Sequence, residues 1–177
     1  MVEHTVKSFD DEIGALRGLI AEMGGLAEVA IARSVDALVR RDTELAKEIV
    51  KADARIDALE VEVDRLAVKI IALRAPMADD LRDVISALKI SGIIERIGDY
   101  AKNIAKRTKI LVEMRTISGP DAALRRMARE VQVMLRDTLD AFVQADVAKA
   151  EEVRQRDFDV DQMYNALFRE FLTFMME

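Results

Sequence analysis

The sequence has no cysteine and one histidine, and these absences exclude several kinds of chemistry. Without cysteine there is no disulfide, no thiolate metal site and no thiol nucleophile. His4 lies close to the N-terminus, where we do not expect a ligand of a main site. One histidine in that position cannot complete a Ser/His/Asp set or the Glu-x-x-His sites of ferritin-like oxidases. Side-chain metal ligands must therefore be oxygen atoms, and an enzyme is not expected.

Long hydrophobic runs and an excess of positive charge are also missing. No stretch approaches the ~20 apolar residues that span a bilayer, and the N-terminus lacks a basic region followed by an apolar run. Lys and Arg number 27 against 33 Asp and Glu, which leaves a formal net charge of -6 and argues against broad nucleic-acid binding. The lack of cysteine also suits a reducing cytosol, so we expect a cytoplasmic protein that is neither secreted nor membrane-spanning.

Helix breakers are rare, with two prolines and seven glycines in 177 residues. The remaining composition, rich in Ala, Leu, Ile, Val, Glu, Arg and Lys, is typical of long packed helices, so we predict an all-α fold. Apolar spacing and punctuation predict five helices, at about 9–39, 43–74, 78–114, 121–144 and 147 to the end. Asp42 or Thr43 is expected to cap the second helix, and Pro76 to end it in a tight antiparallel turn. Its predicted apolar stripe is Ile56, Leu59, Val63, Leu66, Ile70 and Leu73.

The chain also repeats itself at a spacing of 104 residues. At this spacing Asp42 falls on Asp146, Asp53 on Asp157 and Asp57 on Asp161. We therefore predict two repeats of three helices, 1–117 and 118–177, of which the second contains only two. The sixth helix is expected to be missing from this chain, as in a truncated protein. In a complete chain, the apolar C-terminal end would need cover from another chain.

Four acidic residues form the main candidate site. Because the second and third helices form a hairpin about Pro76, Asp53 should face Asp99 and Asp57 should face Glu95. Each pair of acids on one helix is four residues apart and shares one helix face. Repulsion among four carboxylates would be relieved by a cation, and oxygen ligands favour Mg, Ca, Mn or iron over structural zinc. Gly98 fits a close approach of the two backbones.

A simpler interpretation stays open, because acid pairs at this spacing are common on solvated helix faces. Basic side chains nearby could neutralise the carboxylates within the protein: Arg55, Arg96, Lys102 and Lys106. A third pair at the same spacing, Asp157 and Asp161, would form a second site in the second repeat.

The stretch "PMADDLRDVISALKISGIIERIGDYAKNIAKR", residues 76–107, resembles the PhoU family of phosphate-uptake regulators. "DARIDALE" at 53–60 is similar to the first repeat of that family, and "RDFDVDQMYNALF" at 156–168 to the second. The resemblance implies tandem three-helix bundles in a cytoplasmic, non-enzymatic negative regulator that takes part in phosphate homeostasis and signal transduction. It implies contacts with the PstB-like ATPase of a phosphate transporter and with a PhoR-like sensor kinase, and a homodimer.

The resemblance also implies a divalent or trivalent metal, Fe, Mn, Mg or Zn, on E(D)xxxD pairs. By position these pairs are Asp53, Asp57, Glu95 and Asp99, with Asp157 and Asp161 in the second repeat. The alternatives are an accessory protein of another phosphate or metal permease, or a metal-storage protein, on the same fold. A di-metal phosphatase is the enzymatic alternative, but no nucleophile or supporting histidine favours it.

Overall fold

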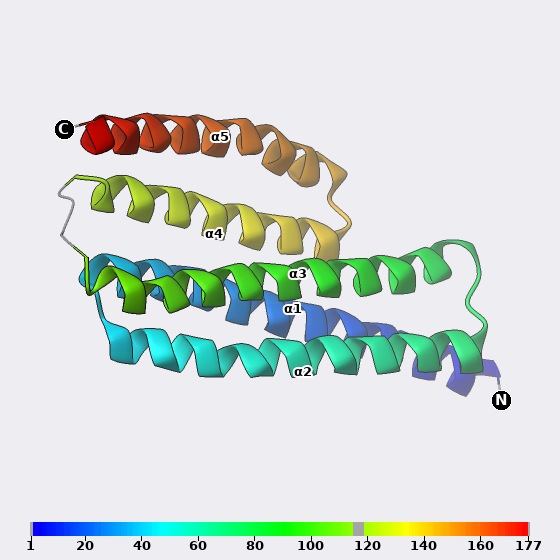
Figure 1. Cartoon of the computed structure of the whole chain (residues 1–177). Helices are drawn as coiled ribbons and strands as arrows, with labels where there is room; N and C mark the ends of the chain where they lie inside the picture. Colours follow the sequence, from blue (N-terminus) through cyan, green and yellow to red (C-terminus); the bar gives the residue numbers. More distant parts are fainter. Residues whose placement is uncertain (1, 115–118, 177) are drawn as a thin grey trace.

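The computed structural model describes residues 2–114 and 119–176, with side chains from residue 9 onward, and within these ranges it contains helices and no strand. This confirms the predicted all-α class. The five helices are α1 (Val2–Arg40), α2 (Thr43–Arg74), α3 (Ala78–Leu111), α4 (Asp121–Gln144) and α5 (Val147–Met176), shown in Figure 1. The predicted boundary between repeats, at 117, lies outside the described residues.

Helix ends follow local signals closely. α4 has the predicted bounds, and Asp42 caps α2 by accepting a hydrogen bond from the backbone N–H of Leu45 at 2.9 Å. α1 begins earlier than predicted, at Val2, and α3 ends three residues sooner, at Leu111. At that end the N–H of Met114 donates to the carbonyl of Leu111, a tighter turn than the α-helix makes.

The α1–α2 and α4–α5 turns have the same geometry at the 104-residue spacing. Asp146 accepts from the N–H of Lys149 at 3.0 Å, as Asp42 does from Leu45. The residues before the two aspartates, Arg41 and Ala145, both adopt left-handed backbone conformations, with φ of 56° and 53°. The same spacing of side-chain cap and left-handed residue therefore produces the same turn twice.

The α2–α3 turn forms at Pro76, as predicted. Ala75 ends α2 in a left-handed conformation, with φ of 47°, and its N–H still donates to the carbonyl of Ile71. Proline disfavours the helical conformation at the residue before it, and α3 begins two residues after it. The result is a hairpin of two helices of more than thirty residues each, 32 and 34.

The main core lies among α1, α2 and α3. α2 contributes buried residues at helical spacing: Ala46, Ile49, Asp53, Ile56, Leu59, Val63, Ala67 and Ile70. The facing set on α3 is Val84, Ala87, Ser91, Ile94, Gly98, Ala101, Ala105 and Thr108. The predicted burial is wrong for one residue of the stripe, Leu73, which is 67% exposed. α2 ends one residue later, and its apolar stripe has rotated away from α3 at this point. The core is therefore apolar along most of its length but includes one buried acid, Asp53.

The α4–α5 hairpin lies alongside this bundle, with α4 between α1 and α5 (Figure 1). α4 runs antiparallel to α1, which is its close packing partner among the first three helices. In the part of the chain that the structure describes, no helix combines the length and apolar character needed to cross a membrane.

Candidate functional site

The four acids predicted to form the main site lie on the facing helices α2 and α3, but they differ in burial. Asp53 is only 6% exposed and sits in the core-facing stripe of α2, between Ile49 and Ile56. Asp57, one turn on, is exposed, whereas Glu95 and Asp99 on α3 are half-buried. The predicted line of four equivalent carboxylates is therefore one buried acid with three more accessible neighbours.

Gly98 makes space for the buried carboxylate. A Cβ at residue 98 would lie 3.2 Å from Oδ1 of Asp53 and 2.9 Å from Cδ1 of Ile56. A side chain at this position would crowd both groups, so the glycine permits the close approach of α2 and α3 that the sequence suggested. In contrast, a Cβ at Gly92 would meet no atom within 4 Å.

Lys102 pairs with two of the acids from within the protein. Its Nζ donates to Oδ2 of Asp53 at 2.5 Å and to Oδ1 of Asp99 at 2.9 Å, so it bridges α2 and α3. These two hydrogen bonds, the stronger to Asp53, raise the pKa of Lys102 above its usual value. A buried carboxylate needs such a partner, because an unpaired charge at this depth is strongly unfavourable.

The other basic residues considered from the sequence behave differently. Arg55 pairs with Glu22 of α1 at 2.7 Å and with Glu62 at 3.6 Å, and Arg96 donates to the hydroxyl of Tyr100 at 3.4 Å. Lys102, in contrast, contacts two acids of the site, Asp53 and Asp99. The signal for it was its position three residues after Asp99 on the same helix face.

Glu95 keeps an electrostatic strain that Lys102 does not remove. Burial is the first cause that raises the pKa of Glu95, and the negative charges of Asp99, Asp57, Glu60 and Asp53 follow. The other three predicted acids therefore all act electrostatically on Glu95. Glu60, which is not among the predicted ligands, belongs to the same acidic group.

The donor set suits a hard cation, since it consists of carboxylate oxygens. Among the described residues, however, no three side chains of His, Asp or Glu lie close enough together to hold a metal ion. The side chain of His4 lies outside the described set. Taken together, these contacts define an acidic inter-helix site held by a lysine, and metal binding stays a prediction.

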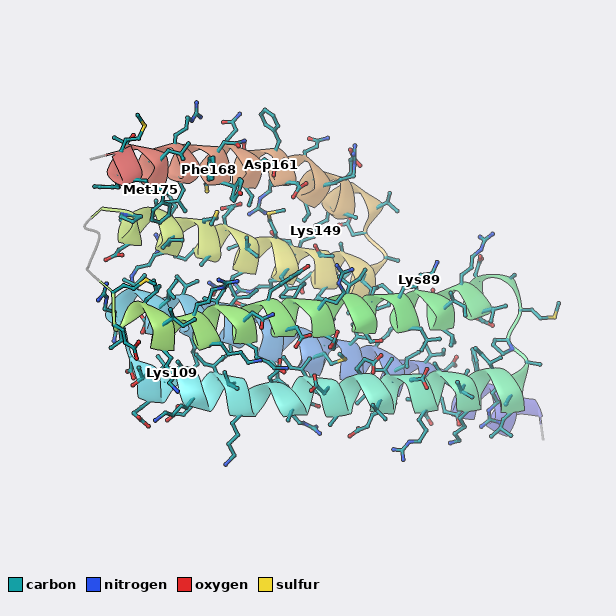
Figure 2. All side chains as sticks on the ribbon, viewed as in Figure 1. Lys89, Lys109, Lys149, Asp161, Phe168 and Met175 are labelled. Carbon is teal, nitrogen blue, oxygen red and sulfur yellow. The ribbon has the colours of Figure 1, made fainter. Side chains whose placement is uncertain are left out.

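Asp157 and Asp161, the acids of the predicted second site, are both exposed on α5. Figure 2 labels Asp161 on this helix, which in Figure 1 is the farthest from α2. Asp157 lies at the edge of an apolar groove of about 330 Å³ between α3, α4 and α5. Apart from Thr138, the other residues that line it are apolar, among them Ile93, Ile97, Met134, Val153 and Val160. The second pair therefore lies apart from the first site.

The fold is thus an all-helical bundle with an acidic site between the two helices of one hairpin. The PhoU domain model matches residues 20–108 and 124–177. The chain belongs to the PhoU family.

Individual relatives support this assignment over nearly the whole chain. A phosphate-specific transport system accessory protein PhoU homolog of Zymomonas mobilis is 54% identical over 176 residues, covering 99% of this chain and 74% of the relative. A protein of the same description from Caulobacter vibrioides is 48% identical, and the match covers 99% of this chain and 76% of that protein. The crystal structure of PhoU from Pseudomonas aeruginosa superposes with a TM-score of 0.89 at 36% identity, over 95% of this chain and 80% of that structure. The crystal structure of the phosphate transport system regulatory protein PhoU from Streptococcus pneumoniae gives a TM-score of 0.81 at 31% identity, over 95% of this chain and 79% of that structure.

Proposed function

We propose that this chain is a non-enzymatic, cytoplasmic adaptor that restrains the phosphate-starvation response and modulates phosphate uptake. The observation that carries the proposal is membership of the PhoU family, with relatives described as accessory proteins of phosphate-specific transport systems. Such an adaptor acts by contact: it binds the PstB-like ATPase of the transporter and the PhoR-like sensor kinase, and holds the kinase in its repressing state when phosphate is plentiful.

Gene deletion tests the regulatory role. We expect phosphate-responsive genes to be expressed in phosphate-rich medium in the deletion strain, and repression to return when the gene is restored. Normal repression in the deletion strain would contradict the proposal.

Co-purification tests the partners. We expect the transporter ATPase and the sensor kinase to co-purify with this chain. Recovery of a different permease would instead favour an accessory protein of another transport system.

We also propose that a divalent or trivalent ion, Fe, Mn, Mg or Zn, binds at Asp53, Asp57, Glu95 and Asp99. The support is the oxygen donor set and the raised pKa of Glu95, because a cation would relieve the repulsion that burial and four neighbouring acids produce. Lys102 bridges two of these carboxylates, so it competes with a bound ion for their oxygen atoms. The ion would supply positive charge that joins α2 to α3. Asp157 and Asp161 are proposed as part of a second site.

Elemental analysis of purified protein tests the metal proposal. We expect Asp57→Asn with Glu95→Gln to lower the retained metal, and replacement of all four acids by Asn or Gln to abolish it. Asp64→Asn, an exposed acid farther along α2, serves as the matched control and should leave the metal content unchanged. Equal metal content in the fourfold variant and the parent protein would refute the site, while the regulatory role would still be tested by deletion.

The homodimer is a third part of the proposal. Exposed aromatic and apolar side chains on α5, including Phe158, Tyr164, Phe168 and Met175, provide apolar surface for such an association. Light scattering coupled to size exclusion should give twice the mass of the 19.9 kDa chain. A monomer mass at micromolar concentration would contradict this part alone.

A further inference from the structure

A second pocket, of about 380 Å³, lies between α1 and α4 and is rich in arginine. α1 contributes Arg33 and Arg40, and α4 contributes Arg125 and Arg129. Its other lining residues are Ala32, Val35, Asp36, Ala128 and Gln132. Four guanidinium groups from two helices thus surround one pocket in a protein whose formal net charge is -6.

The acids near this pocket do not balance its arginines. Oδ1 of Asp36 accepts both from Nη1 of Arg125 at 2.6 Å and from Nε of Arg40 at 3.0 Å, so one carboxylate serves two cations. Arg33 pairs with Glu48 at 2.6 Å. Arg129 is exposed and forms no ion pair with any side chain in the described ranges 9–114 and 119–176. Four positive charges therefore face two negative ones.

Asp36 also organises the arginines. It is half-buried on α1, and because its Oδ1 accepts from both Arg40 and Arg125, it keeps these two cations near one another although like charges repel. Each guanidinium has five N–H donors, and a single carboxylate oxygen occupies few of them. The remaining donors are available to a ligand that can accept several hydrogen bonds and carries about two negative charges.

A phosphate group meets these requirements. Arginine binds phosphate oxygens through a planar, often bidentate fork, and a doubly charged oxyanion balances the local excess. The pocket is also lined by Ala32, Val35 and Ala128, so it combines charged hydrogen-bond donors with an apolar surface. Its volume is in the range of small-molecule sites, which leaves room for an organic substituent as well as for free phosphate.

The opposite end of the α1–α4 pair provides an internal contrast. At the 104-residue spacing, Gly24 corresponds to Ala128, and Leu139 to Val35. There Leu139 lies directly against Gly24, and Arg136 is matched by one acid, Glu28. The equivalent position is therefore filled and balanced, whereas the arginine pocket is open and positively charged.

We propose that the pocket between α1 and α4 binds a phosphate-bearing anion through Arg33, Arg40, Arg125 and Arg129. This site is distinct from the acidic site between α2 and α3, and the proposal does not depend on the regulatory function proposed above.

Isothermal titration of the full chain with inorganic phosphate, ATP and sulfate tests this proposal. EDTA in the buffer removes any contribution from metal at the acidic site. We expect Arg129→Ala to weaken binding of the preferred anion by about tenfold, the loss expected for one charged hydrogen-bonding partner. Arg82→Ala, an exposed arginine on α3 that pairs with Asp79, is the matched control and should bind as the parent protein does. Tighter binding of ATP than of phosphate identifies an organic phosphate as the ligand class, and the reverse identifies free phosphate.

Asp36→Asn adds a readout that a purely structural role would not give. Removal of the competing carboxylate frees donors on two arginines, so phosphate or ATP should bind more tightly than to the parent protein. The proposal is overturned if neither anion binds at millimolar concentration, or if Arg129→Ala and Arg82→Ala weaken binding equally.

Discussion

At the residue scale, the acidic site depends on one buried carboxylate and the lysine that accompanies it. Asp53 occupies a core position on α2, where neighbouring positions hold Ile49 and Ile56. Its charge is tolerated because Lys102 reaches it across the helix interface and because Gly98 leaves space beside it. The energetic role of each residue can be tested separately.

We predict that Lys102→Met destabilises the fold by about 2–3 kcal/mol, because it leaves the Asp53 carboxylate buried without a partner. Chemical denaturation measures this change. Lys47→Met, which breaks an exposed ion pair with Glu44, is the control and should change stability by about 0.5 kcal/mol or less. Combining Lys102→Met with Asp53→Asn should recover part of the loss; no recovery would show that the two residues are not coupled.

Glu95 makes stability depend on pH in a direction opposite to that of a typical paired acid. Its folded-state pKa is raised above the ordinary value of 4.5, so between these two pKa values the folded chain binds more protons than the unfolded chain. Stability from this group is therefore lost as the pH rises through the window, and it returns on acidification.

We predict that Glu95→Gln stabilises the metal-free protein by about 0.5–1 kcal/mol at pH 7.5, because it removes repulsion with several neighbouring acids. The advantage should shrink at pH 4, where the parent glutamate is largely protonated in both states. Thermal unfolding in EDTA at both pH values measures it, with Glu152→Gln, an exposed acid on α5, as the control. A variant that is less stable at both pH values would contradict the assigned repulsion.

At the element scale, the contact between α1 and α4 joins the α4–α5 hairpin to the three-helix core. This contact combines a close apolar approach, Gly24 against Leu139, with ion pairs between Arg136 and Glu28 and between Arg125 and Asp36. Ion pairs that water still reaches in part contribute modestly, so the apolar approach should determine how well the helices fit.

We predict opposite effects for alanine at two adjacent glycines of α1. Gly24→Ala would place a methyl group where Leu139 already lies, and this overpacking should destabilise the fold by about 1–3 kcal/mol. The higher helix propensity of alanine offsets about 1 kcal/mol of that loss. Gly25→Ala meets no atom within 4 Å and should stabilise the chain by up to about 1 kcal/mol. Denaturant unfolding of both variants measures the difference, and equal stabilisation would show that α4 does not lie against Gly24.

At the scale of the whole molecule, burial is unevenly distributed between the two groups of helices. α2 and α3 each contribute eight buried residues, whereas α4 contributes Ala128, Leu135 and Ala141 and α5 contributes Val153 and Leu167. α5 also exposes several aromatic side chains, of which Phe168 is labelled in Figure 2. Local stability follows buried apolar contact, so it should fall from the first three helices to the last.

Hydrogen exchange measured by mass spectrometry should show this gradient. We predict that amides of α5 exchange at least about tenfold faster than those at the centres of α2 and α3, because few buried side chains hold α5 in place. The two central helices provide the internal reference within the same molecule. Uniform protection along all five helices would contradict the prediction and would indicate that α5 is covered in solution.

The sequence by itself determined the helices and most of the core. Caps, turns and apolar spacing involve residues within about four positions of each other, so Asp42, Pro76 and the stripe on α2 could be interpreted locally. The antiparallel hairpin about Pro76 predicted that the acids of α2, Asp53 and Asp57, would lie near Glu95 and Asp99 on α3. The family resemblance of residues 76–107 also came from sequence alone.

The tertiary structure decided which side chains meet. Whether Asp53 faces solvent or Lys102 depends on the rotation of α2 about its own axis, and this is set by packing along the whole hairpin. The arginine pocket depends on the docking of α4 against α1, which brings Arg129 to residues that lie almost a hundred positions earlier in the chain. Spacing along one helix predicts which residues share a face, but only the packing of helices determines what that face contacts.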